Sequence, residues 1–286
     1  PDPETGLPCG TIRIPASLVH NEVDYVGSRS MLHRAVARFK EGVLAAIKNN
    51  PYVLQYMLLD DPDDIAEIDL TAGTEMEFYV MTPDDMADRE RLHTSQVMKE
   101  QYWKRTQGIV RTAMEECLKL LELYGFEVEM GHKEVGGIKP EMAHGGELDH
   151  IMEQLEIDWK YSDPMQAADN DYQARYIIKD VFRRYGLNVT FLAKPVQGVA
   201  GRGKHVHIGA RAILKNGKKV NIFTAKDAAH HFMNPIGFGA LMGILKNYEI
   251  INPFVSATND AFNRLKPGFE APVCVVTSLG KGIDVP

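Results

Sequence analysis

One segment with the pattern of a β-strand constrains the possible fold of this chain more than any other segment. Residues 74–81 read TEMEFYVM, an alternating run rich in aromatic and branched side chains, which predicts a β-strand. Glu75 and Glu77 are two positions apart, so a strand places both carboxylates on one face, roughly 6–7 Å from each other. A solvated strand face tolerates such a pair, and so does a site that binds cations. The run alone leaves both interpretations open.

The composition narrows the class of protein. The chain has 286 residues, 44% of them hydrophobic and 25% charged, which suits one large globular domain or two small ones. Its net charge of −7 argues against a nucleic-acid partner. The three cysteines show no CxxC spacing, which favours a reduced, cytoplasmic protein without a zinc motif. We find no apolar run long enough to span a bilayer, so we expect no membrane partner.

The order of the predicted elements indicates an α+β fold built on one mixed or antiparallel sheet. Apolar spacing and cap residues predict helices over residues 29–50, 107–124, 163–186, 225–249 and 251–263. Alternation predicts further strands over residues 126–132, 152–161, 188–194, 205–214, 220–223 and 271–276. Residues 84–105 are charged and weakly periodic, which predicts a surface loop or insertion.

Four more segments carry residues that could bind a ligand or take part in catalysis. HKEVGG at 132–137 and EQLEID at 153–158 each place a Glu on a predicted strand. GVAGRGKHVHIG at 198–209 is a glycine loop that runs into His205 and His207, and NRLKPGFEAPV at 263–273 presents charges around a Pro-Gly turn. Taken alone, the two Glu segments and the Pro-Gly turn each fit an exposed charged surface, and the His pair fits a hydrogen-bonded pair in the core. Together, carboxylates and one imidazole suit Mg²⁺ or Mn²⁺ beside phosphate groups.

The order and the residue sequences of these segments resemble those of the catalytic domain of the glutamine synthetase family. The resemblance is carried by GTEMEFYV, GFEVEMGHKEVGG, EQLEIDWKYSDPMQAADN, VTFLAKPVQGVAGRGKHVHIG and NDAFNRLKPGFEAPV. It covers nearly the whole chain apart from an insertion at about 84–106. It implies a curved half-barrel sheet that forms an active-site funnel with flanking helices.

The resemblance also implies domain limits. PDPETGLP at the start is similar to the segment that closes the family's small N-terminal domain. Residues 1–20 would then end a β-grasp-like domain, and residues 21–286 would form the catalytic domain without its C-terminal part. The family's later arginine-rich segments, which carry the third ligand of the second ion, have no counterpart before Pro286.

The resemblance implies a site for two or more Mg²⁺ or Mn²⁺ ions. Matching positions make Glu77, Glu134 and Glu156 ligands of the first ion, and Glu75 and His205 ligands of the second. The interval between Glu134 and Glu156 is longer than the family's, and Glu141 within it is a rival for the role of Glu134. Glu134 is preferred, because its motif matches on both sides.

Substrate roles follow from the same resemblance. Gly201, Arg202 and Arg264 would bind the amino-acid substrate, and His207 and Lys194 would lie at the nucleotide. Arg264 and Glu270 would take part in catalysis, with Glu270 accepting a proton from ammonium. The implied reaction phosphorylates the γ-carboxylate of glutamate with ATP, and ammonia then displaces phosphate to form glutamine.

Two departures leave other functions open. The family's loop Asn is Ala200 here and its Ser is Arg202, which favours an alternative activity as a glutamate–amine ligase. The missing arginine segments favour a non-catalytic structural or regulatory homologue. For any of these, the resemblance implies a cytoplasmic homo-oligomer of stacked rings.

Overall fold

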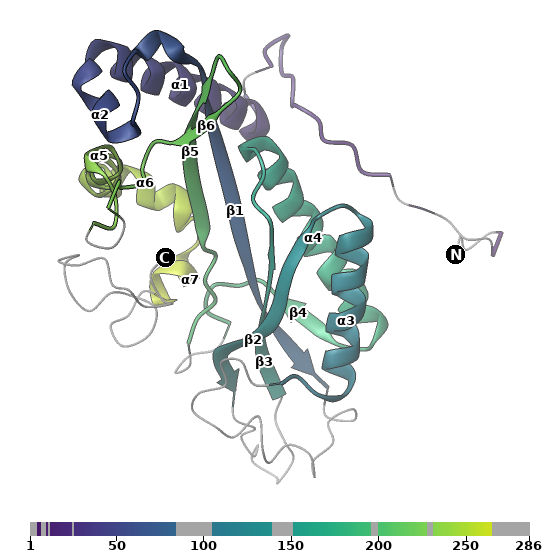
Figure 1. The fold of residues 1–286 in the computed structure, drawn as a ribbon. Coiled ribbons are helices and arrows are strands. Elements are labelled where there is room, and N and C mark those ends of the chain that lie inside the picture. The colour runs from purple at the N-terminus through teal and green to yellow at the C-terminus, as the bar shows by residue number, and fades with distance from the viewer. Residues whose placement is uncertain are drawn as a thin grey trace.

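The computed structural model describes residues 5–6, 10, 12–24, 26–83, 105–138, 151–195, 200–227 and 231–264. Helices and strands form an α+β arrangement around one antiparallel sheet, which confirms the predicted fold class (Figure 1). In the described residues no helix is both long and apolar enough to cross a membrane. The predicted limit between two domains at residue 20 stays a prediction.

The sheet is organised around one long strand, β1 (Ile65–Thr82). This strand begins well before the predicted run at 74–81, because its N-terminal half pairs with β5 (Val206–Leu214) from Ile65 to Thr74. Its C-terminal half pairs on the other side with β3 (Ile151–Trp159). Pairing with distant strands therefore extends the strand beyond what local alternation predicts.

The remaining strands complete the order β2-β3-β1-β5-β6, with β4 beside β1. They are β2 (Val128–Ile138), β4 (Asn188–Thr190) and β6 (Lys219–Asn221). β4 and β5 pair with successive parts of β1 and leave residues 75–78 between them. The described residues between β4 and β5, 191–195 and 200–205, are not in strands, so the strand predicted over 188–194 ends at Thr190.

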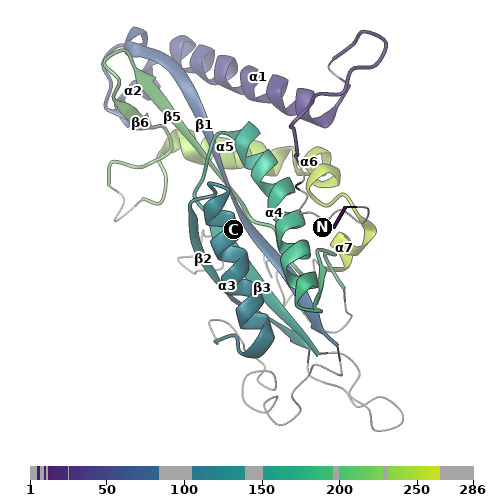
Figure 2. The same cartoon turned by 90° about the vertical axis from the view of Figure 1, so that its right-hand side faces the viewer.

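One face of the sheet is covered by α3 (Gly108–Leu123) and α4 (Pro164–Arg184) (Figure 2). Met76, Phe78 and Val80 of β1 point to this side and are fully buried with side chains of both helices. The rings of Phe78 and Phe182 meet edge to face, with their centroids 5.4 Å apart. Because strand side chains alternate, Glu75 and Glu77 point to the opposite face.

A second apolar cluster fixes the other end of β1. Ile65 and Ile68 are buried there against α1 (Ser28–Asn49) and α2 (Leu54–Met57). Two short 3₁₀ helices, Pro51–Val53 and Pro62–Asp64, connect α1 to the strand. The two ends of the strand are thus held by separate clusters, and Glu75 and Glu77 alternate with the residues of the first one.

The C-terminal helices are shorter than predicted. α5 (Pro235–Lys246) does not begin at residue 225, because the Asn234 side chain caps it by accepting from the Gly237 N–H at 2.9 Å. α6 (Tyr248–Val255) contains Pro253, and α7 (Asn259–Arg264) follows it. The predicted strand at 271–276 lies outside the described residues.

Candidate metal and substrate site

The polar face of the sheet brings three strands together in one row. In the antiparallel register Glu77 of β1 lies opposite Glu156 of β3, and Glu156 lies opposite His132 of β2. Glu75 lies opposite Asp158 one step along the same face. The alternation that places two carboxylates on β1 therefore places acidic or imidazole groups on its neighbours as well.

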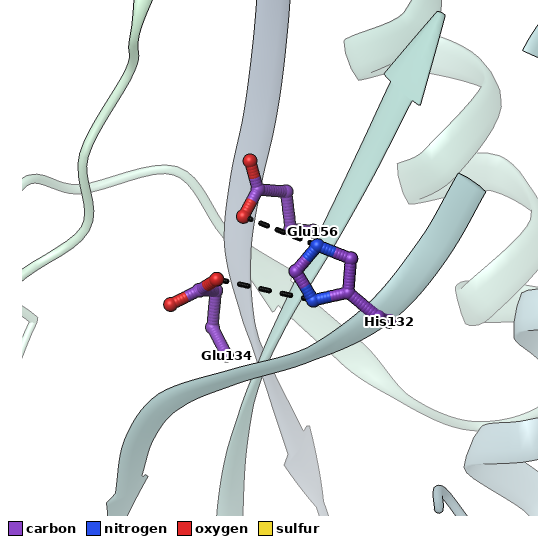
Figure 3. Close-up of side chains that lie close together, drawn as sticks. All are labelled: His132, Glu134 and Glu156. Atoms are coloured by element: carbon purple, nitrogen blue, oxygen red, sulfur yellow. Dashed lines mark ion pairs between the residues drawn. The ribbon is translucent and has the colours of Figure 1, made fainter. Parts of the chain in front are cut away.

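His132, Glu134 and Glu156 form the tightest group on this face (Figure 3). Their ligand atoms all lie within 4.8 Å of one another. The Nε2 atom of His132 is 3.6 Å from Oε2 of Glu156, and its Nδ1 atom is 3.9 Å from Oε1 of Glu134. Asp158 is next to them, with Oδ2 at 3.8 Å from Nε2 of His132. The group combines two carboxylates and one imidazole in a space suited to a single ion.

The electrostatics of this group favour a positive charge. Burial raises the pKa of Glu156 far above the usual carboxyl range, and its hydrogen bond with Glu134 and the charges of Asp158 and Glu77 raise it further. Burial opposes protonation of His132, but the hydrogen bonds with Asp158 and the Lys133 carbonyl and the charges of Asp158 and Glu134 together outweigh burial and raise the pKa of His132. Both shifts show that the crowded carboxylates favour bound protons. A divalent cation would neutralise the same negative charge.

A second group surrounds Glu75. The Nδ1 atom of His205 lies 2.8 Å from Oε2 of Glu75, and the Nε2 atom of His207 lies 2.6 Å from Oε1. The hydrogen bond with His205 holds the pKa of Glu75 down at about 2 despite partial burial, and His207 adds to this effect. Glu75 is therefore a carboxylate at neutral pH, with an imidazole on each of its oxygens.

The glycine loop between β4 and β5 closes over Glu77. The Gly203 N–H donates to Oε2 of Glu77 at 2.6 Å. A Cβ atom added at Gly203 would lie only 2.5 Å from Oε1 of Glu77 and 3.2 Å from Nε2 of His205. Tyr79 anchors the loop at its start by donating its hydroxyl to the Ala200 carbonyl at 2.7 Å. Glycine is required at position 203 because the backbone touches both ligand candidates.

Arg264 lies against the same loop. A Cβ atom at Gly201 would lie 2.4 Å from Cγ of Arg264, so the arginine stem fills the space that a side chain there would need. Asp260 holds α7 in place by accepting from the backbone N–H groups of Ala193 and Lys194 at 2.8 and 3.3 Å. These contacts bring Arg264 and Gly201 together, as the sequence motifs require.

Arg202 and Lys194 are more enclosed than their predicted roles suggest. Arg202 is 9% exposed, and its Nη1 donates to the backbone carbonyls of Gly203 at 3.2 Å and Glu77 at 3.4 Å. Burial lowers the pKa of Arg202 to about 10, and the nearby charge of Arg175 acts in the same direction. Lys194 is 6% exposed. Its role at a nucleotide stays a prediction, as does the role of Arg202 at the substrate.

Two predicted residues are not placed. Glu270 and Glu141, the candidate proton acceptor and the rival metal ligand, both lie outside the described residues. Glu134 lies beside Glu156 and His132, and the choice between it and Glu141 stays a prediction.

The donor atoms of this face match those that divalent ions prefer. Carboxylate oxygens suit Mg²⁺ and Mn²⁺, and an imidazole nitrogen is more readily accepted by Mn²⁺. Glu134, Glu156 and His132 supply carboxylate and imidazole atoms close enough to bind one ion. Glu75 and His205 supply a second group of such atoms. The residues therefore fit the implied ions.

Three residues of this face were absent from the predicted site. His132 precedes Glu134 by two positions, and Asp158 follows Glu156 by two, so the spacing that singled out Glu75 and Glu77 also points to them. Gln154 has the same spacing before Glu156, and its amide donates to Glu77. Its role depends on a contact across strands, which spacing alone does not reveal.

The fold and the site define a protein with a carboxylate-rich, metal-competent face on an antiparallel sheet. The sequence profile described as "Glutamine synthetase, catalytic domain" matches residues 61–280. The chain belongs to the glutamine synthetase family through this catalytic domain.

Individual relatives agree with this assignment. The glutamine synthetase of Clostridium saccharobutylicum is 30% identical over 73% of this chain and 42% of its own length. That of Halobacterium salinarum is 26% identical over 97% of this chain and 53% of its own length. This chain therefore spans only about half the length of these relatives.

Solved structures share the fold. The Plasmodium falciparum glutamine synthetase aligns with a TM-score of 0.58 and 21% identity, over 86% of this chain and 45% of that one. The ligand-free structure of GmaS aligns with the same TM-score and 20% identity, over 84% of this chain and 46% of that one.

Proposed function

We propose that this chain is the catalytic part of an ATP-dependent glutamate–ammonia ligase that forms glutamine through a γ-glutamyl phosphate intermediate. The observation that carries the proposal is the position of two ligand groups on one sheet face under a glycine loop. His132, Glu134 and Glu156 form one group, and Glu75 with His205 forms the other. The proposed reaction is the one that membership of the glutamine synthetase family suggests.

In this proposal Glu77, Glu134 and Glu156 hold the first ion, with His132 as a further ligand, and Glu75 and His205 hold the second. Bound Mg²⁺ or Mn²⁺ would offset the negative charge of the phosphate oxygens during transfer. The buried carboxylates keep the ligand atoms on a rigid sheet, so little reorganisation is needed at the moment of reaction.

The loop and its neighbours orient the substrates. Arg264, packed against Gly201, meets the carboxylate of the amino acid, and His207 lies on the nucleotide side with Lys194. Glu270 takes the proton from ammonium, so that neutral ammonia attacks the γ-carbonyl carbon and phosphate leaves with the bonding electron pair. The active protein is a cytoplasmic homo-oligomer.

The test is an assay of the intact protein with glutamate, ammonium, ATP and Mg²⁺ or Mn²⁺. We expect phosphate release and glutamine formation in equal amounts, and loss of both in Glu134→Ala. Gln55→Ala on the exposed surface of α2 serves as the control, since its side chain is exposed and donates to the local Tyr52 carbonyl. ATP turnover that does not depend on ammonium would overturn the ligase assignment.

A glutamate–amine ligase is the second candidate, because Ala200 cannot make the amide contact that the family's Asn makes. A panel of primary amines in place of ammonium separates the two functions. Faster turnover with one amine than with ammonium would favour this candidate. If calorimetry shows no Mn²⁺-dependent binding of ADP to the intact protein, a non-catalytic homologue is favoured.

A further inference from the structure

Gln154 occupies an unusual position beneath the glycine loop. It lies on β3 two residues before Glu156, opposite Tyr79 of β1, and is 1% exposed. Its Nε2 donates to Oε2 of Glu77 at 2.6 Å and to the Gly201 carbonyl at 3.2 Å. One amide nitrogen thus touches both a proposed metal ligand and the proposed substrate loop.

The orientation of this amide follows from its partners. A carboxylate oxygen and a backbone carbonyl both accept hydrogen bonds, so both must face the NH₂ group. The carbonyl oxygen of the Gln154 amide is buried without a hydrogen-bond partner among the described residues. Such an arrangement is stable only where the two donated hydrogen bonds compensate for the free-energy cost of burying that oxygen.

Two donors converge on one oxygen of Glu77. Gln154 and the Gly203 N–H both reach Oε2, each at 2.6 Å. These bonds fix the rotation of the carboxylate group, while Arg202 holds the backbone carbonyl of the same residue. Glu77 is therefore positioned at its side chain and at its backbone by different parts of the chain.

We infer that Gln154 is a positioning residue that couples amino-acid binding at the Gly201 loop to metal binding at Glu77. The inference rests on the proposed function of both sites. When the loop settles around the amino acid, the amide that bonds Gly201 also holds Glu77 in its ligand orientation. By linkage, the ion strengthens the binding of the amino acid by the same factor.

The test measures Mn²⁺ affinity of the intact protein by calorimetry, with and without saturating glutamate. We expect glutamate to tighten Mn²⁺ binding in the wild type. In Gln154→Met, which keeps the side-chain length but removes both donors, we expect Mn²⁺ affinity to fall roughly 10-fold or more and the effect of glutamate to disappear. Gln154→Glu keeps the shape, removes the donors and adds a charge, so it should lose the coupling as well.

Gln55→Met is the matched control, because Gln55 is exposed and, among the described residues, donates to the local Tyr52 carbonyl and to no group of the site. Circular dichroism and the melting temperature establish that each variant is folded. Wild-type Mn²⁺ affinity and coupling in folded Gln154→Met would overturn the inference while leaving the proposed function intact. Absence of Mn²⁺ binding in the wild type would instead overturn the proposed function.

Discussion

Glu77 of β1 lies directly opposite Glu156 of β3, and both side chains are almost fully buried, at 4% and 5% exposure. Like charges in directly opposite positions destabilise a sheet. The stability of this part of the molecule therefore depends on what neutralises the pair. A proton on Glu156 does so in the absence of ions, and a divalent cation does so when bound.

This dependence predicts a pH effect. Because the fold raises the pKa of Glu156, its protonated form stabilises the folded protein at low pH, and this contribution is lost as pH rises from about 5 towards the folded pKa. With EDTA present, we expect the free energy of unfolding to fall between about pH 5 and pH 9 in the wild type and less in Glu156→Gln. At the alkaline end the variant should be more stable by about 1 kcal/mol or more.

Urea denaturation at three pH values measures this difference. Addition of Mg²⁺ or Mn²⁺ should restore stability to the wild type at alkaline pH and do less for Glu156→Gln. Parallel pH profiles for the two proteins would show that the pair is not the source of the effect.

Glu75 should behave in the opposite way. The hydrogen bond with His205 lowers the pKa of Glu75 to about 2, so its contribution to stability is present above the ordinary carboxyl pKa and is lost as pH falls towards 2. In the metal-free protein labelled with ¹³C at glutamate side chains, we expect the Glu75 carboxyl signal to remain that of a carboxylate down to about pH 3. In His205→Ala the transition should move to higher pH. An unchanged titration in that variant would refute the role of His205.

Gly203→Ala tests the close approach of the loop to the ligands. The new Cβ would lie 2.5 Å from Oε1 of Glu77, so the carboxylate or the loop must move. We expect Mn²⁺ affinity to fall by about 10-fold or more. Gly42→Ala is the control, because a Cβ on this residue of α1 meets no described atom within 4 Å. That substitution should stabilise the helix by roughly 0.5–1 kcal/mol without affecting the ion.

The core face contains an ion pair that is independent of the site. Lys133 of β2 has a fully buried side chain, and its Nζ lies 2.6 Å from Oε1 of Glu153. Lys133→Met would leave the Glu153 charge buried and unpaired, so we expect a loss of about 3–5 kcal/mol in the free energy of unfolding. Adding Glu153→Leu should recover most of this loss. A loss that the double substitution does not recover would show that Lys133 acts by packing and not by charge.

Several features were predictable because they depend on residues close together in the chain. The alternation at 74–81 predicted a strand with Glu75 and Glu77 on one face, and the structure has both. The helix predicted over 163–186 matches α4, which Asp163 caps by accepting from the N–H groups of Met165 and Gln166. The order of the motifs predicted the family, which the profile match confirms.

Other features required contacts across the fold. The helix predicted over 225–249 begins only at Pro235, because Asn234 caps it and also donates its amide to the Ile222 carbonyl. β1 extends back to Ile65 because β5 pairs with it. The pairing with β5 is not indicated by the local sequence, whereas Asn234 before Pro235 is a local helix-start signal that the predicted range did not use.

Residue types and a period of two were enough to determine which carboxylates share a face of β1. They did not determine that Glu77 meets Glu156, that His132 completes the group, or that Gln154 reaches both Glu77 and Gly201. Those relationships depend on the register between strands far apart in the chain. Packing of Phe78 and Leu155 against α3 and α4 sets that register, since a slip by one residue would turn every apolar side chain towards the polar face.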